Sequence, residues 1–222
     1  MFEQIRASDI YVQYIDAHFS KGSFTNRVQV KTGSGVRWLT VPLQNVKLET
    51  EIRRTRVNYQ QPWRRKHIEM LKQSYARGKF SADMVSLVEE VYRHGDETIS
   101  DLAIRSMDSI CAYYGLTRGK RILQSPELNV EGSGSAKVMG MVQELLGTVY
   151  VTGHGAQNYL AHEIFEQAGI EVRYMNYKKT PYPQMHGTFT PYVSILDLVA
   201  NVGPAGKEYI CSDTINWREF LK

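Results

Sequence analysis

The sequence is poor in the residues that define disulfide scaffolds and metal sites. It holds two cysteines in 222 residues, Cys111 and Cys211, which stand far apart and lack a partner motif. A small secreted scaffold needs several paired cysteines, so this pattern predicts a reducing compartment, and we expect the cytoplasm. The six histidines lack the paired spacing of a zinc site, so no metal centre is expected.

Long apolar runs and linker-like stretches are also missing. No run approaches the roughly 20 residues that cross a bilayer, and the first residues carry no signal-peptide pattern. We therefore expect a soluble protein with a single domain over residues 1–222. The P-loop and Gly-x-Ser-x-Gly motifs are absent, which argues against P-loop ATP hydrolysis and serine-hydrolase chemistry. No cofactor motif is identified.

Charge is unevenly distributed along the chain. Residues 47–79 carry ten Lys or Arg against three Glu, a local charge of +7 in a chain whose net charge is +4. Such a region attracts nucleic acid, a nucleotide or a sugar phosphate. The alternative is a solvated helix face without a partner.

The periodicity predicts an α/β fold. We expect strands at 10–15, 28–31, 36–42, 52–57, 121–123, 148–152 and 171–177, and helices at about 63–77, 81–93, 98–114, 135–146, 156–168 and 193–201. The second half alternates strand and helix, which predicts a mainly parallel sheet with flanking helices in the C-terminal two-thirds. The first 60 residues predict an antiparallel β extension at the N-terminus.

The predicted helix at 193–201 is apolar except for one polar stripe. Ser194, Asp197 and Asn201 lie at i, i+3 and i+7, so they share a face. A helix with this pattern is buried, and its polar groups need partners. The stripe faces either an internal hydrogen-bond network or a ligand.

A glycine turn precedes the helix predicted at 156–168. Gly153, His154 and Gly155 follow a predicted strand, and a helix N-terminus after such a turn suits a phosphate or carboxylate. His154 is a candidate for bonding substrate or for proton transfer, although a lone histidine often does neither. The loop at 131–137 is a second candidate anion site, or a flexible loop with a serine N-cap.

The segment Pro62 to His67 places three cations in a predicted first helical turn. Pro62 suits the first helical position, and the helix dipole there favours anions, so Arg65 and Lys66 indicate an anion site. Trp63 either stacks on a base or sugar ring or belongs to the core. Earlier in the chain, Asp16 and the polar loop at 20–27 follow a strand, where functional loops are common.

Eight short segments resemble the WbqC-like protein family, in order along nearly the whole chain. They are Tyr14-Ile15-Asp16, residues 20–27, Trp38 to Pro42, Trp63 with Lys66-His67, Ser125-x-Glu127-Leu128, Gly153-x-Gly155-x-x-x-Tyr159-Leu160, Tyr182-Pro183-Gln184 and Ser194-x-x-Asp197-Leu198-x-x-Asn201-x-Gly203. Members of this family occur in bacterial polysaccharide loci, notably O-antigen clusters.

The resemblance implies a cytoplasmic transferase of cell-surface polysaccharide (lipopolysaccharide O-antigen) biosynthesis. It attaches glycine or another small acyl or aminoacyl group to an amino sugar on a nucleotide or lipid carrier. The implied catalytic residues are Asp197, His154 and Asp16. The implied substrate-binding residues are Asn26, Arg27, Lys31, Trp63, Arg65, Lys66, His67, Ser125, Glu127, Gly153, Gly155, Tyr159, Tyr182, Gln184, Ser194 and Asn201.

The sequence departs from the family pattern in three places. Family members begin with a strand bearing His-Gln-Pro-x-Tyr just before the equivalent of residues 2–4, whereas this sequence starts after that point. Ile10, Val12 and Tyr14 are therefore expected near an unprotected strand edge. Ala17 replaces a second Asp and Gln29 replaces a common basic residue, which weakens an acid/base role for Asp16.

A second hypothesis comes from another functional class. The basic region at 47–79, together with Trp63, would suit a non-catalytic nucleotide- or nucleic-acid-binding protein. Nucleic-acid binding falls steeply with salt, whereas a small pocket for a sugar nucleotide responds weakly. On the transferase hypothesis, the partner is a sugar nucleotide or carrier-linked sugar, and no stable nucleic acid is expected.

Overall fold

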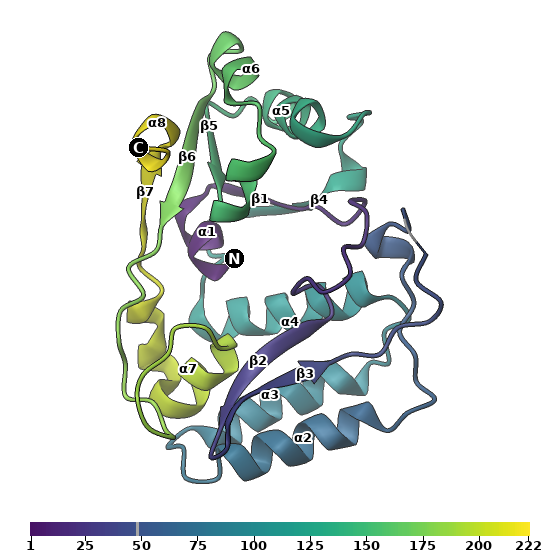
Figure 1. Ribbon diagram of the computed structural model, residues 1–222, viewed down its shortest axis with the longest axis vertical. Helices are drawn as coiled ribbons and strands as arrows, with labels where there is room; N and C mark the ends of the chain where they lie inside the picture. Colours follow the sequence, from purple (N-terminus) through teal and green to yellow (C-terminus); the bar gives the residue numbers. More distant parts are fainter. Residues whose placement is uncertain (48) are drawn as a thin grey trace. The chain divides into compact units, whose positions relative to one another are not determined.

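A computed structural model describes residues 1–47 and 49–222, and this part of the chain forms two compact units (Figure 1). The first unit comprises Met1–Tyr14, Leu116–Lys179 and Ile210–Lys222. The second comprises Ile15–Gly115 and Thr180–Tyr209. Within the described residues, no helix has both the length and the apolar character of a membrane span.

The first unit contains two small sheets covered by short helices. Strand β1 (Ile10–Gln13) pairs in parallel with β4 (Arg121–Gln124), and β5 (Val149–Thr152) pairs in parallel with β6 (Glu171–Asn176). The last strand, β7 (Asp213–Asn216), runs antiparallel to β6. The helices are α1 (Phe2–Ala7), η2 (Ser125–Glu127), α5 (Gly134–Glu144), η3 (His154–Asn158), α6 (His162–Gln167) and α8 (Trp217–Phe220).

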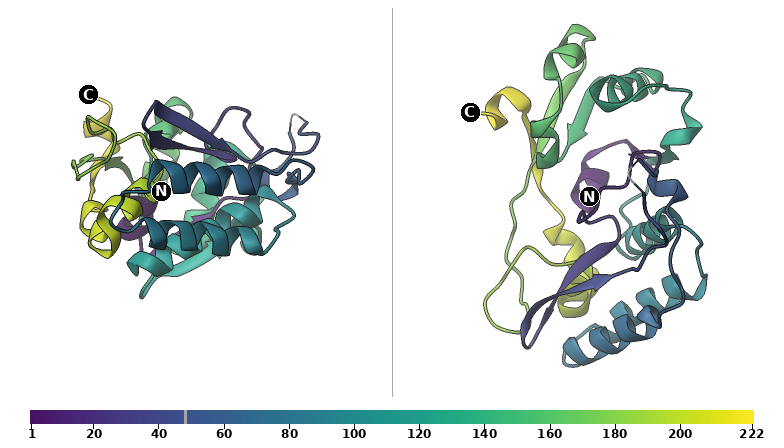
Figure 2. Two further views of the ribbon diagram at one scale, coloured as in Figure 1. Left: turned by 90° about the horizontal axis from the view of Figure 1, so that it is seen from below. Right: turned by 45° about the vertical axis from the view of Figure 1, so that its right-hand side comes forward.

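The second unit packs a β-hairpin and four α-helices. Strands β2 (Arg27–Thr32) and β3 (Gly35–Thr40) form the antiparallel hairpin, which contacts α2 (Figure 2). The other elements are η1 (Ile52–Arg54), α2 (Trp63–Ser74), α3 (Ser81–Arg93), α4 (Ile99–Tyr114), α7 (Ile195–Val202) and η4 (Gly203–Tyr209). Helix α7 ends at Gly203, where φ is +65° and a Cβ would lie 2.5 Å from the Phe80 ring, so only glycine fits.

Alternating side chains explain why the hairpin forms one wall of the second unit. Val30 and Leu39 are buried, whereas Val36 and Trp38 on the opposite face are exposed. The face with Val36 and Trp38 is open over part of its length, because Lys31 on the same face is buried and bonded to Gln184. A core cluster of the same unit consists of Val41, Val57, Trp63, Val91, Ile99 and Leu102.

The α/β class is confirmed, but the strands are arranged differently from the expectation. They divide among three small sheets, and the strand predicted at 10–15 pairs in parallel with β4 instead of joining the antiparallel N-terminal extension. Among the described residues, that extension is the β2–β3 hairpin with two isolated antiparallel bridges, His18 with Glu51 and Leu43 with Val57. The strand predicted at 52–57 is also wrong, because residues 52–54 form a 3-10 turn in which Thr55 Oγ1 donates to the Glu51 carbonyl.

The helix predicted at 156–168 is divided into η3 and α6. Ser135, at the start of α5, is responsible for part of this break. Its Oγ accepts a hydrogen bond from the Ala161 amide at 3.0 Å and donates to the Tyr159 carbonyl at 3.3 Å. These bonds engage backbone groups that a continuous helix would pair internally.

Candidate functional site

The polar stripe of α7 lies inside a hydrogen-bond network of the second unit. Asp197 is fully buried, with a relative exposure of 0%. Its Oδ2 accepts a hydrogen bond from the Tyr75 hydroxyl at 2.8 Å, and its Oδ1 accepts one from the Tyr182 hydroxyl at 2.8 Å. The Oδ1 atom also accepts from Gln184 Nε2 at 2.9 Å and from Asn201 Nδ2 at 3.2 Å. The carboxylate is therefore solvated by four side-chain donors in place of water.

Two tyrosines keep their protons in this network. Burial raises the pKa of both Tyr75 and Tyr182 well above the ordinary value, and the negative charge of Asp197 raises it further. Both hydroxyls therefore remain donors to Asp197 at neutral pH.

Lys31 connects the β2–β3 hairpin to the segment that precedes α7. Its Nζ donates to Gln184 Oε1 at 2.8 Å and also to the carbonyl oxygens of Gly187 and Thr188. An ammonium group has three hydrogens, so these acceptors use its full donor capacity. The Lys31 amide also donates to the Tyr75 hydroxyl at 3.1 Å, which links Lys31 to Asp197 through one side chain.

The other two stripe residues position the ends of α7. Ser194 is the N-cap, and its Oγ accepts from the Leu196 amide at 3.3 Å. The Ser194 amide donates to the Gln29 carbonyl at 2.7 Å, so the start of α7 is fixed to β2. Asn201 Oδ1 also accepts a hydrogen bond from the Met185 backbone amide at 3.3 Å. The stripe thus joins α7, the hairpin and residues 182–190.

The open face of the hairpin carries an aromatic group beside a cation. The Arg27 guanidinium lies over the Trp38 ring with Cζ 4.2 Å from the ring centroid. The Phe24 ring is 5.5 Å from that of Trp38, and Phe24 and Trp38 are 70% and 38% exposed. In the described part of the chain, Arg27 Nε is buried without a hydrogen-bond partner. We call Phe24, Arg27 and Trp38 the hairpin platform.

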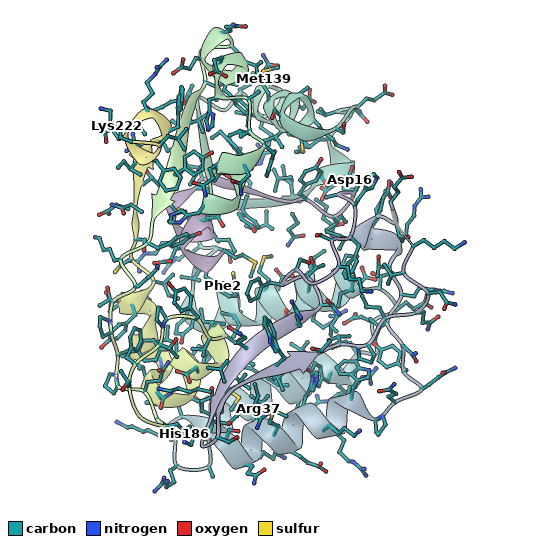
Figure 3. The ribbon with its side chains drawn as sticks, in the orientation of Figure 1. Phe2, Asp16, Arg37, Met139, His186 and Lys222 are labelled. Atoms are coloured by element: carbon teal, nitrogen blue, oxygen red, sulfur yellow. The ribbon has the colours of Figure 1, made fainter. Side chains whose placement is uncertain are left out.

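Two other predicted residues of the second unit, Asn26 and Asp16, have structural contacts. Asn26 donates from Nδ2 to the Val41 carbonyl at 2.9 Å and closes the base of the hairpin. Asp16 lies near the Glu51–Arg53 ion pair, and its charge helps to raise the Arg53 pKa after the larger effect of Glu51. Figure 3 shows the positions of Asp16, Arg37 and His186 in this unit.

Trp63 and His67 lie in the interior of the second unit. Trp63 is 4% exposed and donates from Nε1 to the Asn58 carbonyl at 3.1 Å. His67 Nδ1 lies 2.9 Å from the Tyr92 hydroxyl. Burial lowers the His67 pKa to about 4, so the ring is neutral at pH 7. For Trp63, this is the core location that the sequence left open as an alternative to stacking.

Arg65 and Lys66 are exposed in the first turn of α2. Pro62 is the N-cap and not the first helical residue, while the helix itself begins at Trp63, the start of the predicted range. Arg65 forms a long ion pair with Glu69 at 3.5 Å, and both side chains are exposed. Such a pair contributes little and leaves Arg65 available to an anion.

The glycine turn of the first unit differs from the expected helix N-terminus. Gly153 caps the five-residue η3, and a Cβ at Gly155 would meet nothing within 4 Å. His154 is exposed and donates from Nε2 to the Met175 carbonyl at 2.7 Å, which makes Nδ1 the acceptor in the neutral ring. Tyr159, at the end of η3, is 62% exposed.

The remaining two predicted residues belong to η2 in the first unit. Ser125 is buried, with a relative exposure of 1%. The Glu127 carboxylate accepts from the Gln124 amide at 2.6 Å and completes a capping box. Glu127 therefore has a structural contact in addition to its expected role.

The predicted residues gather most closely around Asp197. Lys31, Tyr182, Gln184, Ser194 and Asn201 join it in one network, whereas Ser125, Glu127, Gly153, His154, Gly155 and Tyr159 belong to the first unit. Sequence reasoning missed Tyr75 and the exposed pair Phe24 and Trp38. No sequence pattern singled out Tyr75, because it is one aromatic residue at the end of a helix. Strand alternation does place Arg27 and Trp38 on one face.

Three comparisons relate this chain to known proteins. The model of the WbqC-like protein family matches residues 1–209. An uncharacterized protein of Mycobacterium tuberculosis (strain ATCC 25618 / H37Rv), Rv1507c, is 29% identical over 212 residues, which cover 94% of this chain and 90% of the relative. No solved structure matches.

Proposed function

We propose that this chain, which belongs to the WbqC-like protein family, is a transferase of cell-surface polysaccharide (O-antigen) synthesis. It attaches glycine or another small acyl or aminoacyl group to the amine of a sugar carried on a nucleotide or a lipid. The observation that supports this proposal best is the hairpin platform, which lies on the strand pair that Lys31 ties to the Asp197 network.

The platform has the chemistry that a sugar phosphate requires. The exposed Phe24 ring offers an apolar surface to the C–H face of a sugar or to a base, as aromatic side chains commonly do in ligand sites. The Arg27 guanidinium has the fork geometry that suits phosphate. Its Nη2 donates to the Gly22 carbonyl, which helps to hold the guanidinium over the Trp38 ring. Arg65 and Lys66 are further candidates for phosphate contacts.

Asp197 is assigned an orienting role. Its two oxygens already accept four side-chain hydrogen bonds, so proton abstraction would require the network to open. The carboxylate holds the side chains of Tyr182 and Gln184 in place. Together with Lys31, these residues fix the conformation of the segment from 182 to 190. His154, in the first unit, keeps its predicted place as a candidate for proton transfer, since Nδ1 is the acceptor in its neutral form.

Ligand binding to platform variants tests the proposal. UDP-glucosamine is the probe, and its affinity is measured by calorimetry for the unaltered chain, Phe24→Ala and Arg27→Gln. We expect each substitution to weaken binding by roughly tenfold, since one stacking or one charged contact is worth about 1–2 kcal/mol. Arg37→Gln is the matched control, because Arg37 alternates with Trp38 on β3 and donates to Ser34. Equal affinity in all four proteins would remove the platform from the site.

A further inference from the structure

His154 of the first unit has an exposed side chain, yet its ring makes three fixed contacts. Its Nε2 donates to the Met175 carbonyl at 2.7 Å. The centroid of the Tyr177 ring lies 5.0 Å from that of the imidazole, and the centroid of the Phe220 ring lies at 4.8 Å. Rotation of the imidazole would break the hydrogen bond and both aromatic contacts, so together they fix its orientation.

The second ring nitrogen of His154, Nδ1, is the one left to a ligand. In the part of the chain that the structure describes, Nδ1 accepts no hydrogen bond and the ring forms no ion pair. A Cβ at the adjacent Gly155 would meet nothing within 4 Å, so the backbone beside His154 leaves room for a ligand. Nδ1 can gain a proton while Nε2 still donates to the Met175 carbonyl, so the ring does not need to move.

Phe220 belongs to the last helix, α8, and is itself held in place. Its ring stacks on the buried Tyr174 ring, with 4.3 Å between the centroids and 7° between the planes. Trp217, three residues earlier, donates from Nε1 to the Glu166 carboxylate at 3.0 Å. These contacts fix α8 to β6 and α6, so the ring that faces His154 has a defined position.

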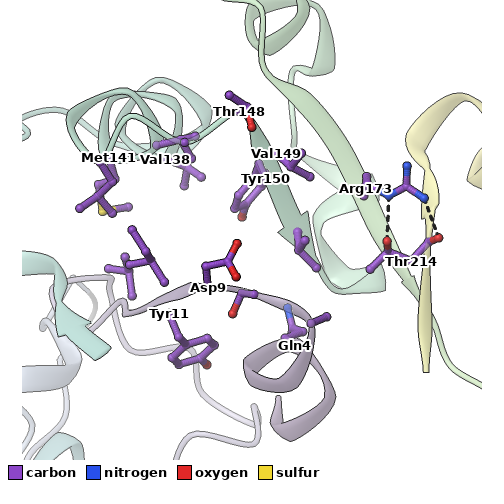
Figure 4. Close-up of a pocket in the computed structure, with 18 of the residues that line it drawn as sticks. Gln4, Asp9, Tyr11, Val138, Met141, Thr148, Val149, Tyr150, Arg173 and Thr214 are labelled. Atoms are coloured by element: carbon purple, nitrogen blue, oxygen red, sulfur yellow. Dashed lines mark hydrogen bonds between the residues drawn. The ribbon is translucent and has the colours of Figure 1, made fainter. Parts of the chain in front are cut away.

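Strand β7 leads the chain into α8. Arg173 of β6 donates from Nε to Thr214 Oγ1 at 2.8 Å and from Nη2 to the Thr214 carbonyl at 2.9 Å, and both residues line the pocket drawn in Figure 4. Asn216 then caps α8 by accepting a hydrogen bond from the Arg218 amide at 3.0 Å. The family model matches residues 1–209, so β7 and α8 lie beyond the matched region. The contact between Phe220 and His154 is therefore not part of the family match.

We propose that Phe220 and Tyr177 are positioning residues, which hold His154 as the proton acceptor for the amine of an amino sugar. The identity of the amine rests on the proposed function, whereas the positioning rests on the contacts within the first unit. An ammonium group of the sugar gives one proton to Nδ1, which leaves a neutral amine and an imidazolium with a hydrogen on each nitrogen. The neutral amine then has the lone pair that attacks an acyl group.

The ring N–H signal of His154 tests the positioning role. In protein labelled with isotopic nitrogen in its histidines, NMR measures how fast the Nε2 hydrogen exchanges with water, and His154→Gln assigns the signal. We expect Phe220→Ala and Tyr177→Ala each to speed this exchange by several-fold to about tenfold, since one aromatic contact has that weight. Phe220→Tyr and Tyr177→Phe keep an aromatic ring and should leave the rate within about twofold.

Controls separate this effect from a general loss of structure. Leu221→Ala is the matched control, because Leu221 follows Phe220 in the chain and is 46% exposed. The ring of His94, in the second unit, is an internal reference that should not change in any variant. Backbone amide spectra show whether each variant is folded. If Phe220→Ala unfolds, Phe220→Leu removes the aromatic ring and keeps an apolar contact with Tyr174.

Titration with glucosamine tests whether Nδ1 faces an amine. We expect the Nδ1 resonance of His154 to shift when glucosamine is added, because the amine bonds to this nitrogen. At a fixed concentration, the shift should fall by about half or more in the two alanine variants, since a mobile ring presents Nδ1 for a smaller share of the time. Glucose at the same pH lacks the amine, so it is the control ligand and should cause no shift.

Each outcome decides the inference. Faster exchange and a smaller response to glucosamine in the alanine variants, both restored in the aromatic variants, support it. Unchanged exchange in both alanine variants, or an Nδ1 resonance that does not respond to glucosamine at about 10 mM, overturns it. Equal UDP-glucosamine affinity in the platform variants, with the His154 response intact, would count against the proposed function alone.

Discussion

Asp197 shows how a single buried carboxylate is accommodated in this protein. Within the described residues it forms no ion pair, and four neutral donors surround it. Hydrogen bonds from neutral groups to a charged one are stronger than those between neutral groups, so the arrangement offsets much of the desolvation cost. The residue therefore holds the second unit together locally as well as shaping the candidate site.

Asp197→Ala should destabilise the protein. The substitution leaves the Tyr75 and Tyr182 hydroxyls buried without their acceptor, and we expect a loss of roughly 2 kcal/mol or more in the free energy of unfolding. Urea denaturation measures this loss. Tyr182→Phe, which removes one donor and leaves the carboxylate, should cost about 1 kcal/mol. A stable Asp197→Ala variant that has lost ligand turnover would instead show that Asp197 faces substrate.

The lowered pKa of His67 predicts that the protein loses stability in acid. Its pKa is about 4 in the folded chain and about 6.5 when unfolded, so between these values the unfolded state binds a proton that the folded state does not. The unfolding free energy should fall as the pH decreases from 6.5 to 4, by up to about 3 kcal/mol. Urea unfolding across this range measures the slope.

The control for this pH dependence is His67→Gln. His162 also has a pKa lowered by burial, so it contributes a slope of the same sign that remains in this variant. His67→Gln should therefore reduce the slope without removing it. An identical slope in both proteins would show that His67 does not titrate as its burial implies.

At the scale of elements, α2 combines a buried face with an unusual first turn. Trp63, His67 and Leu71 follow the helical repeat into the core, while Arg65 and Lys66 face solvent. The helix dipole disfavours cations at this end by a few tenths of a kcal/mol each. The sequence predicted both the helix and its exposed charges, but the N-cap position of Pro62 depends on a one-residue shift that periodicity does not resolve.

Replacing Arg65 and Lys66 with Gln tests whether this turn binds an anion. We expect weaker UDP-glucosamine binding, because two positive charges are lost, and a free energy of unfolding within about 0.5 kcal/mol of the original. Calorimetry and urea denaturation measure the two quantities. Lys72→Gln serves as a control, since Lys72 is in the last turn of α2 and pairs with Glu89 at 2.7 Å. Unchanged affinity in the double variant would show that these cations lie on a solvated helix face and bind no anion.

Across the whole molecule, ion pairs offset much of the basic region. Position 48 lies outside the described residues, but five of the ten cations of residues 47–79 contact acidic side chains. The pairs are Arg53 and Arg54 with Glu51, Arg56 with Glu97, Arg65 with Glu69, and Lys72 with Glu89. Two of these partners, Glu89 and Glu97, come from outside the stretch, so a count along the sequence overstates its charge.

This pairing predicts weak binding of nucleic acid. A single-stranded oligonucleotide should bind with low affinity at 50 mM salt and show a shallow dependence on salt, because few phosphates would be neutralised. Sugar-nucleotide affinity should change little over the same range. Filter binding and calorimetry at several salt concentrations make the comparison. Tight oligonucleotide binding that falls steeply with salt would favour the non-catalytic nucleic-acid-binding alternative.

The sequence by itself determined the local features of this protein. The polar stripe at Ser194, Asp197 and Asn201 follows from side-chain spacing on a helix, which is a property of neighbouring residues. Motif spacing also identified the family. Because side-chain spacing is local, the sequence also predicted the α/β class and the 81–93 helix with its observed bounds.

Only the tertiary structure decided which distant groups meet. Tyr75 and Asp197 are 122 positions apart, and no local pattern connects them. The pairing of β1 with β4 depends on a contact between segments more than 100 residues apart, and the break before α6 depends on Ser135, a side chain from another helix. Strand partners and buried networks are set by the packing of the whole chain, so spacing along the sequence does not specify them.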